Sequence, residues 1–454
     1  MKQKITKTTM LCVLMLLCVC SAVLGEVTVV VVPDPQKYSL NLPTADYPEG
    51  IGVIFSAQTE WIVTNSETMN IVFTSYVGDM VDNGPDLAQW DIADSAMGVL
   101  DVSGVPYGVC IGNHDTHYGY SADPYQDFDS AATNFITVFG LARFAGKIWY
   151  HGVSPTQRSS YQIIAVDGQR LLFLHLSIDT PQVELDWAQQ VIDQNPDKLV
   201  VVSTHRYLYD FRIMAGRYGD GRIGIDDLAE QPLASGRYDP EGIWPEELFE
   251  TFIKTNRNIF LVLSGHCHGE YYQVSYNNWD LPVLEVMVDY QDGANGGNGW
   301  LRTMTFDFEA GTVQSDTYSP TLDRYRTVAE GFVETIYIIS LYMDSFPLPP
   351  EEKAILMAQL QADIPDFEKD PAVEAYINSP EIQAWLSYIG MNYAWDGLWI
   401  TSFASGQRDP SFAYSFDPDA YTKRGDLNDD GQIDHRDIRI VVENLDRRTA
   451  RTRR

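Results

Sequence analysis

The sequence predicts an α/β fold in which strands and helices alternate around a shared core. Short apolar runs rich in β-branched residues indicate buried strands, and five of them cover residues 27–33, 71–78, 105–112, 199–204 and 259–265. Helical periodicity appears over residues 86–100, 183–195 and 246–255. The 45% hydrophobic and 12% aromatic content is sufficient for a globular core. This alternation is typical of a layered α/β domain.

Each of the five strand-like runs is followed at once by a residue that can bind a metal ion. Those residues are Asp34, Asp79, Asn113, His205 and His266, with His268 two positions after the last. The chain has only eight His in total, so their placement at strand ends is notable. Open α/β sheets gather their functional groups at the carboxyl ends of strands. The sequence therefore predicts one shared site for more than one metal ion.

The residue types at these strand ends suit the hydrolysis of a phosphate ester. That reaction needs a hydroxide near neutral pH, neutralisation of the non-bridging oxygens, and a proton for the leaving group. Two cations about 3.5 to 4 Å apart supply the first two, and a nearby His can supply the third. A carboxylate that bridges both cations is the usual centre of such a site.

The order of the motifs resembles that of the calcineurin-like metallophosphoesterase superfamily. The family pattern runs D-x-H, G-D-x-x-D, G-N-H-[DE], a lone His after a strand, and G-H-x-H. The corresponding blocks here are Asp34-Pro35-Gln36, Gly78-Asp79-Met80-Val81-Asp82, Gly112-Asn113-His114-Asp115, His205, and Gly265-His266-Cys267-His268. Four of the five blocks match fully and in order. The resemblance implies a layered sandwich of two mixed β-sheets flanked by helices.

The resemblance also implies a role for each matching residue. The first metal would be held by Asp34, Asp79 and His268, with Gln36 at the position of the family's His. The second would be held by Asp79, Asn113, His205 and His266, so that Asp79 bridges the two. His114 would contact the phosphate and protonate the leaving oxygen, oriented by Asp82.

Two departures from the family pattern bear on metal preference and substrate. Gln36 offers an amide oxygen, which binds transition metals less tightly than imidazole, so the first site is expected to favour manganese or magnesium over iron or zinc. Asn83 stands where the phosphoprotein phosphatase branch has Arg, which argues against a protein phosphatase of that type. Arg206 either replaces this missing phosphate-binding cation or faces solvent.

The remaining His and Cys residues have weaker signals. His117 either lines the pocket or is an ordinary loop residue, and His175 is expected to be a hydrogen-bonded core His. Cys110 and Cys267 are expected to be semi-buried thiols, although a pairing between them stays open.

Charge and the first segment bear on location. The formal net charge of −32 argues against a general binder of nucleic acid or anionic membrane. Residues 1–25 have the order of a signal peptide, with basic residues, an apolar core and small residues. We therefore expect a secreted, cell-surface or periplasmic protein with no transmembrane span in the mature chain. An uncleaved anchor and a lipoprotein through Cys18 or Cys20 are the alternatives.

The chain divides into a large domain and smaller C-terminal parts. Residues 26–326 are expected to form the phosphoesterase domain, with a polar excursion over 210–241 that is either a lid or substrate loop or a plain surface insertion. Residues 327–422 are predicted to be a helical region of unknown role. Residues 423–446 contain a calcium-binding repeat, and residues 447–454 form a basic tail.

The predicted calcium loop has oxygen-bearing residues at the spacing of an EF-hand loop. Its ligands would be Asp426, Asn428, Asp430, Gln432, Asp434 and Asp437, with Gly431 at the sharp turn. The segment resembles one repeat of a type I dockerin, which implies a cohesin-like partner. That family normally carries two repeats and this chain shows one.

Two functions of different class remain open from the sequence. The first is a secreted phosphoesterase that uses two divalent metal ions to cleave a phosphomonoester or phosphodiester, with a calcium-binding C-terminal module. The alternative is a weak or inactive phosphoesterase-like protein that acts in cell-surface or cohesin-type assembly.

Overall fold

The computed structural model describes most of the predicted phosphoesterase domain. The described residues are 25–116, 128–166, 169–210, 215–219, 237–267, 269–327 and 411–422. Several sequence predictions fall outside them, namely the signal peptide up to residue 24, His117, His268, the calcium loop and the basic tail.

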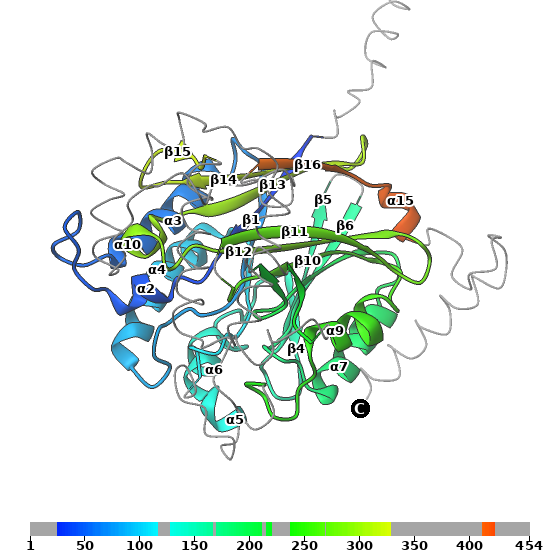
Figure 1. The fold of residues 1–454 in the computed structure, drawn as a ribbon, viewed down its shortest axis with the longest axis horizontal. Helices are drawn as coiled ribbons and strands as arrows, with labels where there is room; N and C mark the ends of the chain where they lie inside the picture. The colour runs from blue at the N-terminus through cyan, green and yellow to red at the C-terminus, as the bar shows by residue number, and fades with distance from the viewer. Residues whose placement is uncertain are drawn as a thin grey trace, which may run out of the picture.

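Two seven-stranded sheets form the centre of the fold (Figure 1). Sheet A runs in the order β15-β14-β13-β1-β2-β3, and β16 also pairs with β14. Its strands are β1 Val27–Val32, β2 Ile71–Tyr76, β3 Tyr107–Val109, β13 Leu301–Asp307, β14 Thr312–Ser319, β15 Arg324–Tyr325 and β16 Ser411–Ser415.

Sheet B runs in the order β11-β12-β10-β7-β6-β5-β4. Its strands are β4 Tyr150–Val153, β5 Ser160–Val166, β6 Gln169–His175, β7 Leu199–Ser203, β10 Ile259–Ser264, β11 Gly269–Tyr276 and β12 Pro282–Asp289. A separate two-stranded ribbon joins β8 Leu208–Asp210 to β9 Ala215–Arg217.

Helices lie on both sides of the two sheets (Figure 1). They are α2 Gln36–Leu40, α3 Gly52–Asn65, α4 Leu87–Ser103, α5 Phe128–Ala131, α6 Thr133–Phe139, α7 Gln182–Asp193, α9 Pro245–Leu248, the π-helical turn η1 Phe249–Ile253, α10 Ala294–Gly297 and α15 Pro418–Tyr421. In Figure 1, α3 and α4 lie on one side of the molecule and α7 and α9 on the other. The predicted α/β sandwich of two mixed sheets is confirmed for these residues.

The middle of each sheet is parallel, and this brings the predicted site residues to one end of the fold. β1, β2 and β3 run parallel in sheet A. β6, β7, β10 and β12 run parallel in sheet B. Because parallel strands end at the same edge, the loops after β1, β2, β3, β7 and β10 can converge.

Burial on both faces explains why the strand-like runs in sheet B are apolar without interruption. In β6, Leu171 and Phe173 face a core between the sheets, whereas Leu172 and Leu174 face a second core under α7 and α9. Phe173 stacks on Phe73 of β2 with ring centroids 3.8 Å apart, which joins the sheets directly. A strand covered on both faces needs apolar side chains at every position.

A buried polar cluster also joins the two sheets, directly below the site. His175 is fully buried, with Nδ1 2.9 Å from Gln162 Oε1 and Nε2 3.0 Å from Ser75 Oγ. The Ser75 hydroxyl is 2.8 Å from that of Ser203. These contacts confirm the prediction that His175 is a hydrogen-bonded core residue. Burial lowers the pKa of His175 to about 3, so this imidazole is neutral in the folded protein at neutral pH.

The lowered pKa of His175 predicts a loss of stability in mild acid. Below its ordinary pKa of 6.5 the unfolded chain binds a proton that the folded chain does not, down to a pH of about 3. The free energy of unfolding should therefore fall by about 1.4 kcal/mol per pH unit through this window. His175→Asn should be less stable at pH 8 but should lose less stability between pH 6 and pH 4. Urea unfolding of the wild type and of His175→Asn at each pH measures this. Equal acid dependence in wild type and His175→Asn would contradict it.

Residues 411–422 differ from the helical region that the sequence predicted there. β16 pairs antiparallel with β14, and Phe412 stacks on Tyr272 with centroids 4.0 Å apart. Phe416 packs on Phe260 at 5.3 Å. The pattern was missed because a five-residue strand has little periodicity of its own. This segment belongs to the core of the large domain.

None of the helices in the described residues combines the length and the apolar character that crossing a bilayer requires.

Candidate metal centre

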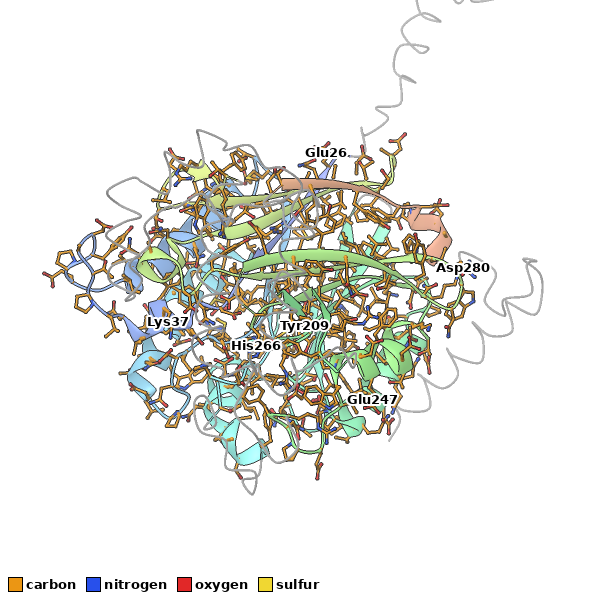
Figure 2. All side chains as sticks on the ribbon, viewed as in Figure 1. Glu26, Lys37, Tyr209, Glu247, His266 and Asp280 are labelled. Carbon is orange, nitrogen blue, oxygen red and sulfur yellow. The ribbon has the colours of Figure 1, made fainter. Side chains whose placement is uncertain are left out.

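Four of the predicted ligands meet around the imidazole of His205. Its Nε2 lies 3.0 Å from Asn113 Oδ1, 3.1 Å from His266 Nδ1 and 3.2 Å from Asp79 Oδ2. Ligand atoms of Asp79, His205 and His266 all lie within 4.8 Å of one another. Residues from the ends of β2, β3, β7 and β10 thus surround one point, and Figure 2 labels His266 there.

The hydrogen bonding of His205 turns its other nitrogen toward this point. Nδ1 lies 2.9 Å from the backbone carbonyl of Val77, and a carbonyl oxygen can only accept, so Nδ1 carries a hydrogen. In the neutral ring, Nε2 then presents a lone pair toward the oxygens of Asp79 and Asn113. Several lone pairs directed at one point suit a cation, and a backbone partner on the far nitrogen is typical of His that bind metals.

A second group of oxygens from the loop after β1 lies next to the first. Asp34 Oδ2 accepts from the backbone N–H of His266 at 2.8 Å, and its Oδ1 lies 3.8 Å from His205 Nδ1. Within the part of the chain that the structure describes, Asp34 Oδ1, Gln36 Oε1 and Asp79 Oδ2 are buried and have no hydrogen-bond partner. Buried oxygens without partners are costly. A divalent cation beside His205 would satisfy the oxygens of Asp34 and Asp79, so these carboxylates fit a metal.

The electrostatics of the cluster also favour an added positive charge. Burial raises the pKa of Asp34 well above its usual range, and the neighbouring carboxylates Asp289 and Asp79 add to this. Burial alone would raise the pKa of Asp79 as well, but the imidazoles of His205, His114 and His266 lower it to about 2. Burial opposes the charged form of His205, yet Asp79 and Asp34 raise its pKa to about 10. A proton on His205 therefore offsets the negative charge of Asp79 and Asp34, as a bound cation would, and metal binding would displace this proton.

The backbone around the centre is held in an unusual conformation. Asp79 has φ of 50° and His266 has φ of 69°, which lie in the left-handed region that non-glycine residues rarely adopt. Gly112 precedes Asn113, and a Cβ there would overlap Asp79 Oδ1. A Cβ at Gly265 would likewise overlap Asp34 Oδ1. These strained and tightly packed turns are what allow ligands from several strands to approach one point.

His114 lies beside the cluster and is held by two contacts. Its backbone N–H donates to Asp79 Oδ1 at 2.8 Å, and its ring Nδ1 lies 2.8 Å from the backbone carbonyl of Asp82. Since that carbonyl can only accept, Nδ1 of His114 carries a hydrogen. The sequence assigned the orienting role to Asp82. The orienting contact in the structure comes from its backbone, whereas its carboxylate accepts from Lys37 Nζ at 2.7 Å.

Asp115 links the two central loops of the site. One carboxylate oxygen accepts from Val81 N at 3.1 Å and the other from Gly112 N at 2.9 Å. Burial raises the pKa of this carboxyl, as does the charge of Asp79. The sequence reading included Asp115 in a motif without giving it a role. Its role is to hold the loops after β2 and β3 together.

Arg206 is neither at the surface nor directed to solvent. It is 3% exposed, and its Nε and Nη2 donate to Asp179 Oδ1 at 3.0 and 2.7 Å. Its guanidinium lies over the rings of Tyr218, Tyr238 and Trp244 at 5.4, 5.1 and 4.9 Å. This environment identifies a structural contact of Arg206, and its predicted contact with phosphate stays a prediction.

The described ends of the excursion over 210–241 pack against the metal centre. Tyr218 and Tyr238 approach the ring of His266, with centroids 6.1 and 5.8 Å apart. Asp179 also accepts from the backbone N–H of Tyr238 at 2.6 Å. A buried ion pair of 2.7 Å joins Asp239 to Arg158. Of the two sequence alternatives, these contacts favour a loop that belongs to the site.

Two residues near the site were missed by sequence reasoning. Asp289 ends β12 and is fully buried, and its charge contributes to the raised pKa of Asp34. The sequence does contain a pattern that indicates Asp289, because the largely apolar run VLEVMV before it is another strand that ends on a carboxylate. Lys37, next to Gln36, had no signal because a lysine after a turn is usually a surface residue.

The sequence left open whether the two cysteines outside residues 1–25 pair with each other. Cys110 and Cys267 are both buried, and neither forms a disulfide among the described residues. The expectation of two thiols is confirmed, whereas their expected partial exposure is not.

The fold and the site together define an α/β sandwich with a polar centre at its parallel strand ends. Residues 57–270 match the model of the family described as calcineurin-like phosphoesterase. This match over these residues agrees with the resemblance that the order of the motifs indicated.

Known proteins give three further similarities. Over 283 residues the chain is 33% identical to the protein of Bacillus subtilis (strain 168) named Uncharacterized protein YvnB, covering 61% of this chain and 19% of that protein. The chain thus spans about a fifth of the length of this curated relative. The structure of purple acid phosphatase PPD1 from yellow lupin (Lupinus luteus) seeds has a TM-score of 0.40 at 15% identity, covering 66% of this chain and 53% of that one. The calcineurin-like phosphoesterase YfkN from Bacillus subtilis has a TM-score of 0.31 at 11% identity, covering 74% and 98%.

Proposed function

We propose that this protein is a secreted phosphoesterase that depends on two divalent metal ions and hydrolyses a phosphomonoester or phosphodiester. The observation that carries the proposal is the pair of buried carboxylate oxygens without hydrogen-bond partners, on Asp34 and Asp79, beside the imidazole of His205, with His266 next to Asp79. The family of residues 57–270 supports the same reaction class.

The ligands divide into two groups that share Asp79. Asp34 and Gln36 would hold one ion together with His268, and Asn113, His205 and His266 would hold the other. When bound, the two ions supply a hydroxide nucleophile near neutral pH and offset the charge on the phosphate oxygens. Gln36 contributes a neutral oxygen, so manganese or magnesium is proposed in preference to iron or zinc at the first position.

The protein's own part in the reaction is to place a proton donor beside this centre. The Asp82 carbonyl fixes the Nδ1–H tautomer of His114, and the contact from His114 N to Asp79 Oδ1 sets its distance from the ligands. His114 Nε2 would then protonate the leaving oxygen of the substrate. The rings of Tyr218 and Tyr238 would exclude water from the side on which they approach His266.

An inactive binding protein is not favoured by this geometry. A site that had lost its activity would not be expected to keep left-handed strain at both Asp79 and His266. Secretion through residues 1–25, calcium at Asp426 to Asp437 and a cohesin-like partner remain part of the proposal and rest on the sequence alone.

The proposed activity is tested with two chromogenic substrates and defined metals. Purified full-length protein, stripped of metal and reloaded with Mn²⁺, should hydrolyse p-nitrophenyl phosphate, bis(p-nitrophenyl) phosphate, or both. The same protein with a chelator should not, and metal analysis should find two ions per chain apart from calcium. Absence of turnover of both esters with two ions bound would reject the proposal.

A further inference from the structure

We propose that Lys37 is a substrate-binding residue that contacts the phosphate group, in place of the Arg that the motif lacks at Asn83. This inference deepens the proposed function and rests on it. It begins from the acidic residues around the site. Asp34, Asp79, Asp82, Asp115 and Asp289 all lie within the cluster or its supporting loops. A phosphate ester brings further negative charge, which a cationic side chain next to the proposed metal ions would help to offset.

Only two cationic side chains come from the loops that carry the described ligands. Residues 33–41, 77–86, 110–116, 204–210 and 265–267 include Lys37 and Arg206 and no other Lys or Arg. Arg206 is 3% exposed, is paired with Asp179 and is covered by three aromatic rings. The Lys37 side chain is 25% exposed. A phosphate arriving from solvent can therefore reach the ammonium of Lys37 more readily than the guanidinium of Arg206.

Lys37 and His114 contact the same residue, Asp82. Lys37 Nζ donates to Asp82 Oδ1 at 2.7 Å, and the carbonyl of the same Asp82 holds His114 Nδ1 at 2.8 Å. Lys37 also follows the buried Gln36 directly in α2. Figure 2 labels Lys37 on α2 and His266 at the end of β10. One residue, Asp82, thus connects the ammonium to His114.

An ordinary bracing role for Lys37 is a weaker explanation of this contact. The loop that carries Asp82 is already fixed by Asp115, whose Oδ1 accepts from Val81 N at 3.1 Å. Gln89 Oε1 accepts from the backbone N–H groups of Asp82 and Asn83 at 2.9 and 3.0 Å. Ser39 Oγ donates to the Met80 carbonyl at 2.6 Å. A partly exposed ion pair adds little stability to a loop held in this way.

An ammonium has three N–H donors, so Lys37 can donate to Asp82 and to a phosphate oxygen at the same time. Its charge would offset a non-bridging phosphate oxygen while Asp82 keeps the lysine in place. Binding energy of this kind acts on the ground state and the transition state alike. Loss of Lys37 should therefore weaken phosphate binding and raise KM more than it lowers kcat.

The test measures binding of inorganic phosphate to Mn²⁺-loaded full-length protein by isothermal titration calorimetry, together with kcat and KM for p-nitrophenyl phosphate. Lys37→Met should raise the Kd for phosphate by about 10-fold, as expected when one charge-assisted contact worth about 1.4 kcal/mol is lost. Lys37→Arg should stay within about 3-fold of wild type because it keeps the charge. Lys254→Met is the matched control, since Lys254 forms a 2.8 Å ion pair with Glu250 and is 32% exposed.

A second pair of variants separates contact with phosphate from bracing. Asp82→Asn keeps the backbone carbonyl that orients His114 and removes the ion pair. If Lys37 contacts phosphate, Lys37→Met should still weaken binding about 10-fold in the Asp82→Asn background. If Lys37 only braces Asp82, the double variant should match Asp82→Asn alone, and the inference is overturned.

The wild-type result distinguishes this inference from the proposed function. Phosphate binding that depends on Lys37, without turnover of either ester, would keep the binding role and reject the enzyme. Turnover with a Kd that Lys37→Met leaves unchanged would reject the Lys37 contact and keep the enzyme. Absence of phosphate binding in the wild type would reject both.

Discussion

Asp79→Asn is expected to abolish phosphoesterase activity, with a loss on the order of 10³-fold or more. Asn has the same shape and can still accept from His114 N through its oxygen. Its amide N–H₂, however, would replace Asp79 Oδ2, which lies 3.2 Å from His205 Nε2 within the cluster. The bridging position would then present hydrogens toward the metals, and one negative charge would be lost. Both ions should bind more weakly.

The measurement combines metal analysis with turnover of p-nitrophenyl phosphate at several Mn²⁺ concentrations. Asp91→Asn makes the same chemical change on an exposed position of α4 and should leave both quantities unchanged. Because an unfolded variant would also be inactive, circular dichroism of Asp79→Asn must show the wild-type spectrum. A folded Asp79→Asn protein that retains two tightly bound ions and near wild-type activity would contradict the assignment of Asp79 as the bridge.

The central strands and the site residues that follow them could be predicted from sequence, because burial of the strands determines both. Strands buried on two faces are largely apolar, and a polar residue just after their end marks the point where the chain leaves the core. The runs before Asp34, Asp79 and His205 follow this pattern, with Ser75 and Ser203 as buried polar residues that bond to each other. Each run lies at the parallel centre of its sheet. The convergence of these residues follows from the parallel order of the strands.

The supporting contacts could not be predicted in the same way because they depend on side-chain directions between distant loops. Nothing in the sequence indicates that Asp115 would bridge two loops, or that Asp179 would pair with Arg206. Asp179 comes from the loop after β6, which the sequence reading had not connected with the site. The pairing depends on β6 and β7 being neighbours, and sheet order is not encoded by periodicity.

The role of Asp82 shows how a correct motif can still give the wrong contact. The resemblance implied that Asp82 orients His114, and in the structure the backbone carbonyl of Asp82 contacts the His114 ring. A motif records which residues are near one another, whereas the donor and acceptor atoms depend on the local turn. The carboxylate of Asp82 accepts from Lys37.

The C-terminal edge of sheet A was predicted least well. β16 joins β14 from a position about a hundred residues away in the chain, and the aromatic contacts of Phe412 and Phe416 supply its stability. Pairing between segments this far apart is specified by the surface that receives the strand, here β14 with β11 and β10 behind it. A short strand read alone does not contain that information.

His114→Ala should lower activity by about 10²- to 10⁴-fold while the metal content stays that of the wild type. The contact that links His114 to the cluster is its backbone N–H to Asp79 Oδ1 at 2.8 Å, which alanine keeps. The ring is bound by the Asp82 carbonyl, so its removal leaves the positions of the metal ligands unchanged. Activity and metal binding should therefore separate in this variant, in contrast to Asp79→Asn, where both are lost.

The leaving group gives a sharper test of the proton-donor role of His114. p-Nitrophenolate leaves readily without a proton, whereas an alkoxide needs one, so proton donation matters more for an alkyl phosphate. His114→Ala should lose at least about 10-fold more kcat with an alkyl phosphate, measured by released phosphate, than with p-nitrophenyl phosphate. His151→Ala on exposed β4 is the control and should affect neither substrate. Equal losses with the two substrates would indicate that His114 binds the phosphate without supplying the proton, and loss of metal would show that it supports the ligands instead.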